Sequence, residues 1–213
     1  MIETIIEYFS DFTLVKAIDM AGLVLGLVYL WLEFKASIWL WLVSVIMPIV
    51  HGYLYWERGL YADFGMEVYY VLAAVYGYAM WRWARGRGKN GENGENGRQT
   101  AERPITRFPM RQVLPVAIVG LALWGIIYWI LITWTDSSVP VCDSFTTALS
   151  MVALWSLAQK YAEQWLLWLV VDAVCTVLYI YKQIPFTAAL YGFYTVMAVL
   201  GYRSWLRKMT ASH

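Results

Sequence analysis

The sequence predicts an all-α membrane protein with seven transmembrane helices, arranged as two parallel three-helix repeats separated by a single helix. The prediction comes from the composition, from seven apolar runs and from a similarity between the two halves of the chain. Of the 213 residues, 61% are hydrophobic and 15% are charged, whereas a soluble domain has about 25% charged residues. The net charge of +1 gives no reason to expect nucleic acid as a partner. The chain is therefore expected to lie in a lipid bilayer.

Seven runs are apolar enough to cross a bilayer, which takes about 20 residues of helix. They cover residues 14–33, 36–56, 61–82, 113–134, 144–160, 164–181 and 185–204. Trp and Tyr cluster at the ends of these runs, as in "WLWL", "YLYW" and "YIYK", which is typical of membrane interfaces. The runs divide the chain into an N-terminal amphipathic segment (1–13), a first repeat (14–83), a flexible cytoplasmic linker rich in Gly and Asn (84–112), a linker helix (113–134), a second repeat (143–206) and a tail (207–213).

The distribution of Lys and Arg predicts the direction of the spans. Three of the 16 basic residues, Lys16, Arg58 and Lys182, fall on the side of the N-terminus, which leaves 13 on the side of the linker and the C-terminus. Basic residues favour the cytoplasmic side of a membrane. We therefore expect the N-terminus outside and the C-terminus in the cytoplasm.

An internal repeat relates the first three spans to the last three. "YVLAAVYGYAMW", which ends at Trp81, aligns with "YTVMAVLGYRSW", which ends at Trp205, at an offset of 124 residues. In the second and sixth spans Trp39 matches Trp165, and "YLY" matches "YIY", at an offset of 126 residues. Because one span separates the copies, both run in the same direction. Transporters built from parallel repeats bind their substrates at the interface between the repeats.

The acids do not follow the repeat. On this alignment Asp172 corresponds to Ile46, and Glu67 corresponds to Tyr191. The aromatic and glycine positions recur between the two copies of the repeat, whereas these acidic positions do not. The acids are therefore expected to belong to a binding site that is built on a symmetric frame.

Polar and aromatic side chains form stripes along several spans, because residues four apart share one face of a helix. The candidate substrate-binding residues on these stripes are His51, Glu67, Tyr70, Thr147, Trp155, Gln164, Trp168, Asp172, Thr176 and Tyr179. Aromatic rings attract cations by about 1–2 kcal/mol when desolvated, and a carboxylate adds to this attraction. The stripes predict a site for a small, flat cation. No catalytic residue, metal site or cofactor is expected, since Cys142 and Cys175 lack the spacing of metal ligands.

Asp172 carries the strongest signal. A carboxylate at the centre of a span costs about 3 kcal/mol on insertion scales and usually marks a functional site. The structural alternative is a hydrogen bond to Gln159 or Thr147 on the neighbouring span. Trp155 and Trp168 also have a structural alternative to substrate binding, which is packing between helices.

These features favour a transporter over an enzyme. An aspartyl protease needs two facing acids with a Gly-rich support, and Asp19 and Asp172 lack that context. A retinal protein needs a lysine in its last span, and residues 186–202 contain none. An ion channel or a membrane receptor is the more distant alternative, because rings rather than arrays of charge line the stripes.

Five segments resemble the Pnu family of bacterial vitamin transporters. They are "GLVYLWLEFKASIWLW", "GLYADFGMEVYYVLAAVYGYAMW", "DSFTTALSMVALW", "AEQWLLWLVVDAVCTVLYIYK" and "TAALYGFYTVMAVLGYRSW". The resemblance implies a SWEET-like 3+1+3 fold in a bacterial inner membrane and facilitated diffusion of an unphosphorylated vitamin. It also implies trapping of the vitamin by a cytoplasmic kinase, and homotrimers. The family's binding residues map to Glu67, Tyr70, Gln164, Trp168 and Asp172.

The sequence departs from the family's riboside pattern at three positions. Glu67 stands where Gln is usual, Gln164 stands where Asn is usual, and Tyr78 replaces Trp. Nicotinamide riboside, which has a fixed positive charge and a ribose, is the family's usual substrate. Thiamine is the close alternative because its aminopyrimidine could accept a proton from an additional acid. Riboflavin, which is neutral and larger, fits the acids worst.

Overall fold

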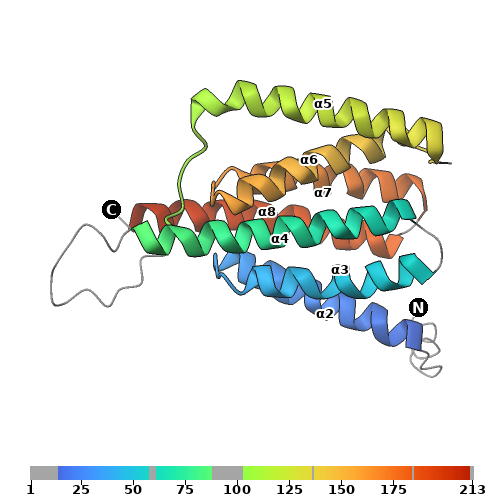
Figure 1. The fold of residues 1–213 in the computed structure, drawn as a ribbon, viewed down its shortest axis with the longest axis horizontal. Helices are drawn as coiled ribbons and strands as arrows, with labels where there is room; N and C mark the ends of the chain where they lie inside the picture. The colour runs from blue at the N-terminus through green and yellow to red at the C-terminus, as the bar shows by residue number, and fades with distance from the viewer. Residues whose placement is uncertain (1–13, 58–60, 88–102, 136, 184, 212–213) are drawn as a thin grey trace, which may run out of the picture. The chain divides into compact units, whose positions relative to one another are not determined.

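The computed structural model of the chain describes residues 14–57, 61–87, 103–135, 137–183 and 185–211. Within these ranges the protein forms seven α-helices and no strand (Figure 1). The helices are α2 (Leu14–Phe34), α3 (Leu40–Glu57), α4 (Tyr61–Arg87), α5 (Met110–Trp134), α6 (Pro140–Ala158), α7 (Gln164–Tyr181) and α8 (Pro185–Ala211). Each predicted span overlaps one of these helices. The amphipathic segment expected over residues 1–13 lies outside the described residues.

Three helices, α5, α6 and α7, are long and apolar enough to cross a bilayer, judged by length and composition within the described residues. Shorter apolar stretches cover residues 24–34 and 40–53. Helices α4 and α8 are each 27 residues long, which exceeds the roughly 20 residues that a span requires. Charged residues and Tyr lower the hydropathy of these two helices.

The ends of the helices differ from the predicted spans for local reasons. Helix α6 begins at Pro140 instead of residue 144, because proline suits the first helical position and Asp143 in the first turn favours the helix dipole. Helix α3 begins at Leu40 instead of residue 36, because Ala36 has a left-handed backbone with φ of 57°. Such a residue ends the preceding helix.

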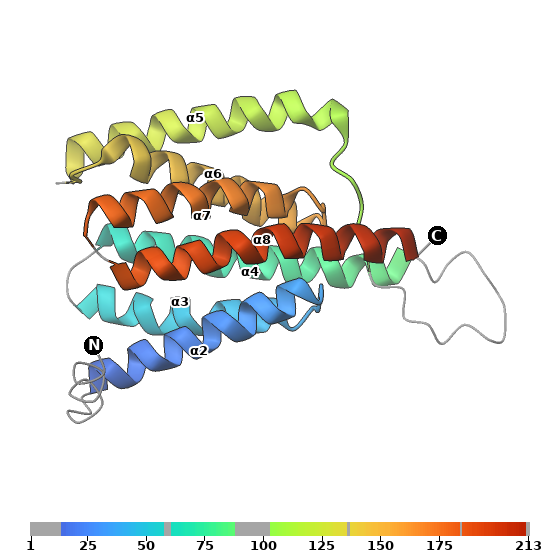
Figure 2. The ribbon, with the colours of Figure 1, turned by 180° about the vertical axis from the view of Figure 1, so that it is seen from behind.

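The chain divides into two compact units, Met1–Val75 and Tyr76–His213, and the boundary falls inside α4. In the first unit α2 packs against α3. In the second unit α5 packs against α6, α6 against α7, and α7 against α8. Two opposite views show α5 at the edge of this second group (Figures 1 and 2).

The turn after α2 and the turn after α6 share one pattern of backbone hydrogen bonds. Each helix closes in a Schellman-type motif around a residue with left-handed backbone, Ala36 (φ 57°) or Lys160 (φ 56°). The hydrogen bonds that follow recur at an offset of 124 residues into the first turns of α3 and α7. The bounds of α3 and α7 differ by the same offset, and so do those of α4 and α8.

This register corrects the expected correspondence between the second and sixth spans. The offset there is 124 residues and not 126, so Trp165 corresponds to Trp41 and Asp172 corresponds to Pro48. Trp41 and Trp165 are 2% and 1% exposed, whereas Trp39 is 63% exposed. A shift of two residues turns a side chain by about 200° around a helix. Matching of aromatic letters permitted the wrong register because the chain has 13 Trp residues.

The segment 103–109 is held against the turn between α6 and α7. The Thr106 N–H donates to the Lys160 carbonyl at 3.1 Å, and the Ala162 N–H donates to the Thr106 carbonyl at 3.0 Å. The Phe108 ring packs against Tyr161 with centroids 5.0 Å apart. The flexible linker expected over residues 84–112 is therefore not found at either end of that range, because α4 extends to residue 87, an anchored segment precedes α5, and α5 begins at Met110. Residues 88–102 lie outside the described part.

Candidate functional site

A polar stripe runs along α7 inside the second unit. Gln164, Trp168, Asp172 and Thr176 follow one another at steps of four, so they share one face of the helix. Gln164 is fully buried and Asp172 is 7% exposed. The stripe is the part of the predicted site that the structure brings together on one element.

Several polar atoms of this stripe have no hydrogen-bond partner in the described part of the chain. Both amide atoms of Gln164, Oε1 and Nε2, are buried and unpaired, and so is the indole Nε1 of Trp168. A buried polar group without a partner costs about 1–3 kcal/mol. Native proteins retain few such groups, and each calls for an explanation. A polar molecule bound against the stripe would supply the missing partners.

Asp172 also lacks the partners that its structural alternative requires. Thr147 donates to the Asp143 carbonyl of its own helix at 2.7 Å. The Gln159 amide donates to the Tyr76 hydroxyl at 2.8 Å and accepts from Arg103 at 2.6 Å. Among the described residues the Asp172 carboxylate makes no hydrogen bond or ion pair; the hydrogen bond nearby runs from the Thr176 hydroxyl to the Asp172 backbone carbonyl at 2.7 Å.

Three tyrosines form an aromatic ladder between α7 and α8. Tyr179 stacks on Tyr191 with centroids 5.2 Å apart and ring planes 19° apart, and Tyr194 meets Tyr191 edge-on at 6.0 Å. The sequence stripes included Tyr179 but missed the two residues on α8. The signal for them was the "YGFY" spacing, which puts two rings on one face of a helix.

The start of α7 is fixed by close packing against α8. A methyl group on Gly201 would meet ring atoms of Trp165 at 2.6 Å, so glycine is required where the two helices approach. Trp165 also meets Trp205 edge-on, with centroids 6.0 Å apart. Both rings are almost fully buried. This packing sets the rotation of α7 and thereby the direction of its polar stripe.

The end of α6 is tied to the part of α4 that belongs to the second unit. The Trp81 indole N–H donates to the carbonyls of Leu157 and Ala158 at 3.2 and 3.1 Å. The Lys160 ammonium lies over the Trp81 ring, 4.2 Å from its centroid. The Gln159 amide, which donates to the Tyr76 hydroxyl, forms a second link between the end of α6 and α4.

Trp155 and Tyr70 are further candidate residues, on α6 and α4 respectively. Trp155 packs its ring against Phe108 and Tyr161, with centroids 6.1 and 5.9 Å apart, so it contacts the segment that precedes α5. Tyr70 contacts Tyr69 in the first unit.

The first unit brings His51 and Glu67 together. His51 Nδ1 lies 3.7 Å from Glu67 Oε1, and the closely packed Gly52 lets α3 and α4 approach each other beside them. The carboxyl group of Glu67 therefore has a partner on the neighbouring helix.

A search of the described residues finds no group of three or more His, Cys, Asp or Glu side chains that could hold a metal ion. The two cysteines, Cys142 and Cys175, are not joined to each other.

Comparison with known proteins identifies the family. The model of the nicotinamide mononucleotide transporter family matches residues 16–207. The chain belongs to this family. It is 28% identical to the riboflavin/roseoflavin transporter RibM of Streptomyces davaonensis, over 88% of this chain and 83% of that protein. It is 22% identical to the nicotinamide riboside transporter PnuC of Escherichia coli, over 89% of this chain and 84% of that protein.

A solved structure is also similar to this chain. The crystal structure of the vitamin B3 transporter PnuC matches with a TM-score of 0.62 and 25% identity, over 88% of this chain and 80% of that one. The expected membership of the Pnu family of vitamin transporters is thereby confirmed. The family consists of transporters and not enzymes. The apolar helices of this chain, together with the family, support a location in a bacterial inner membrane.

Proposed function

We propose that this protein carries an unphosphorylated, positively charged vitamin across the bacterial inner membrane, with nicotinamide riboside as the first candidate. The observation that carries the proposal is the α7 stripe, where polar atoms of Gln164 and Trp168 lie buried without partners among the described residues. Asp172 on the same face is 7% exposed. The riboside offers hydroxyl and amide groups for the Gln164 amide and the Trp168 indole. Its pyridinium ring offers a positive charge for Asp172.

The charge of the stripe favours a cation over a phosphorylated nucleotide. Between Gln164 and Tyr181, α7 carries Asp172 as its one charged residue and has no Lys or Arg. Phosphate recognition relies on guanidinium, ammonium or backbone N–H donors, and a carboxylate would repel a phosphate. We therefore infer the riboside, not its mononucleotide, as the substrate.

The proposed mechanism is facilitated diffusion through a SWEET-like 3+1+3 architecture. The uniform offset of 124 residues between α3 and α7, and between α4 and α8, supports two parallel repeats with α5 as the linker helix. One three-helix repeat would rock against the other around the substrate, with the N-terminus outside and the C-terminus in the cytoplasm. A cytoplasmic kinase would then trap the vitamin by phosphorylation, and a homotrimer is the proposed assembly.

Thiamine is the second candidate, and one observation favours it. Glu67 is an acid in addition to Asp172, and its partner His51 lies 3.7 Å away. A protonated carboxyl group at this position would donate to the aminopyrimidine ring of thiamine. The relative RibM adds riboflavin as a further compound to be tested.

Calorimetric titration of the purified protein tests the proposal. The titrants are nicotinamide riboside, nicotinamide mononucleotide, thiamine and riboflavin, and counterflow in proteoliposomes then tests transport. We expect the riboside to bind and exchange, and the mononucleotide to bind at least about tenfold more weakly because of its phosphate. Tighter binding of the mononucleotide, or no exchange of any of these vitamins, would contradict the proposal.

A further inference from the structure

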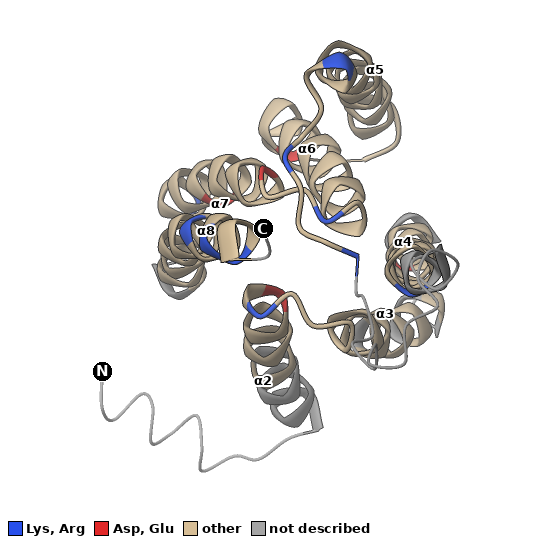
Figure 3. Cartoon of the chain, turned by 90° about the vertical axis from the view of Figure 1, so that its left-hand side faces the viewer, with Lys and Arg blue, Asp and Glu red and all other residues tan. Residues whose placement is uncertain are grey.

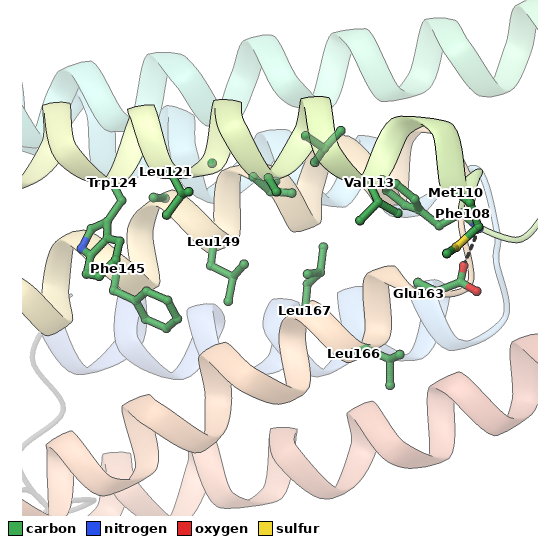
Figure 4. Close-up of a pocket in the computed structure, with 15 residues that line it drawn as sticks. Phe108, Met110, Val113, Leu121, Trp124, Phe145, Leu149, Glu163, Leu166 and Leu167 are labelled. Carbon is green, nitrogen blue, oxygen red and sulfur yellow. Dashed lines mark hydrogen bonds between the residues drawn. The ribbon is translucent and has the colours of Figure 1, made fainter.

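A groove between α5, α6 and α7 is lined by no member of the α7 stripe. Its volume is about 630 Å³. Val113, Leu121 and Trp124 line it from α5, Phe145 and Leu149 from α6, and Leu167 from α7 (Figure 4). The lining is apolar apart from Glu163 at one end. That carboxylate already accepts from the Phe108 N–H at 2.7 Å.

Helix α5 forms the exposed wall of the groove. No described residue of α5 is buried, although the Trp124 indole donates to Ser144 at 3.1 Å and its ring packs against Phe145. The lining on α5 extends from Met110 to Trp124, which is about 21 Å at 1.5 Å per residue. One leaflet of a bilayer has a hydrocarbon depth of about 15 Å. The groove is therefore long enough for a lipid tail.

Positive charge gathers at the end of the groove where α5 begins. Arg107 and Arg111 stand on either side of Met110 in the sequence, and Arg103 lies a few residues upstream. Figure 3 shows basic residues in blue at the start of α5. Arg107 Nη1 lies 3.6 Å from Glu163 Oε1. Arg107 is 60% exposed. Arg111 forms no ion pair with any described residue, which leaves both side chains able to reach a phosphate.

We propose that this groove binds one acyl chain of an anionic phospholipid, whose phosphate is held by Arg107 and Arg111. An apolar lining with a basic rim matches a tail that begins at a charged headgroup and runs into the membrane. Basic pockets on the cytoplasmic side of membrane proteins bind anionic headgroups in this way. A vitamin would find no unoccupied polar partner inside this groove. The lipid would fill the space between α5 and α6 and hold the linker helix against α6 and α7.

Native mass spectrometry of the full chain, with phosphatidylglycerol or phosphatidylcholine added in detergent, tests the proposal. Gly120→Leu fills the groove, since a methyl group at Gly120 already reaches 3.5 Å from Val152. Gly125→Leu is the matched control on the same helix, because no atom lies within 4 Å of its added methyl group. We expect one retained phosphatidylglycerol, its loss in Gly120→Leu and its retention in Gly125→Leu. Arg111→Gln should lower the preference for phosphatidylglycerol over phosphatidylcholine about fivefold.

Three outcomes would overturn the proposal. Equal retention of the two lipids by the unmodified protein would show that no headgroup is recognised. Equal loss in both glycine variants, or equal retention, would show lipid around the protein and not in the groove. A shift of the oligomeric mass in Gly120→Leu with lipid adducts unchanged would show that a second copy of the chain occupies this face. Thermal unfolding of each variant reports whether the fold is kept.

Discussion

Replacement of Gln164 by leucine should stabilise the protein and weaken substrate binding at the same time. The perturbation removes two buried amide atoms that have no partner in the described part of the chain. The fold itself indicates that leucine fits, because Leu40 occupies the corresponding position 124 residues earlier and is also fully buried. If Gln164 is retained for substrate binding at the expense of stability, its replacement by leucine should stabilise the fold.

The expected change in the free energy of unfolding follows from the two unpaired amide atoms of Gln164. Each unpaired buried polar atom costs about 1–3 kcal/mol, so Gln164→Leu should stabilise the folded state by about 2 kcal/mol or more. For a chain of this size 1 kcal/mol corresponds to about 2–4 °C in melting temperature, which gives a rise of about 4–8 °C. Loss of the same hydrogen bonds to a bound vitamin should weaken binding by about 5- to 150-fold.

Thermal unfolding in detergent, combined with calorimetric titration of the vitamin, measures both effects. The control is the reciprocal variant Leu40→Gln, which should lower the melting temperature because it buries an amide in the first unit. If Gln164→Leu instead melts at a lower temperature and binds the vitamin as the unmodified protein does, then the amide is a structural group and the reasoning from its unpaired atoms is wrong.

Three further outcomes are expected. Gly201→Ala should destabilise the protein by about 1–3 kcal/mol in chemical unfolding, because its methyl group overlaps the Trp165 ring; unchanged stability would argue against this packing. Trp81→Phe should cost about 1–2 kcal/mol in the same assay through loss of the indole hydrogen bonds to the end of α6, and an unaltered midpoint would contradict them. If thiamine is the substrate, Glu67→Gln should abolish thiamine binding while riboside binding is kept or gained. Calorimetry with both vitamins separates the two candidates, and His51→Gln serves as the comparison variant.

Much of the fold was predictable from the sequence, because apolar runs report helices directly. The expected spans locate all seven described helices, and the Gly-Tyr…Trp pattern of the third and last spans fixes the correct offset of 124 residues. The register of the second and sixth spans was wrong because exposed and buried tryptophans look alike in a sequence. The hydrogen bonds of the two turns and the burial of the side chains distinguish Trp41 from Trp39 as the counterpart of Trp165.

The candidate site was predictable where one helix carries it. Steps of four along α7 identify Gln164, Trp168 and Asp172 without any knowledge of packing. Residues supplied by another helix were harder to find. Tyr191 and Tyr194 were missed because their significance depends on the approach of α8 to α7, which the ring contact with Tyr179 reveals. The pairing of segment 103–109 with the α6–α7 turn likewise depends on a contact distant in sequence.

Affinity for nicotinamide riboside in Asp172→Asn, measured by calorimetry beside the unmodified protein, tests the central claim most directly. If an inward-facing carboxylate recognises the positive charge of the vitamin, the amide should weaken binding at least about tenfold while the melting temperature stays the same or rises. An affinity equal to that of the unmodified protein would remove Asp172 from the binding site and contradict the account.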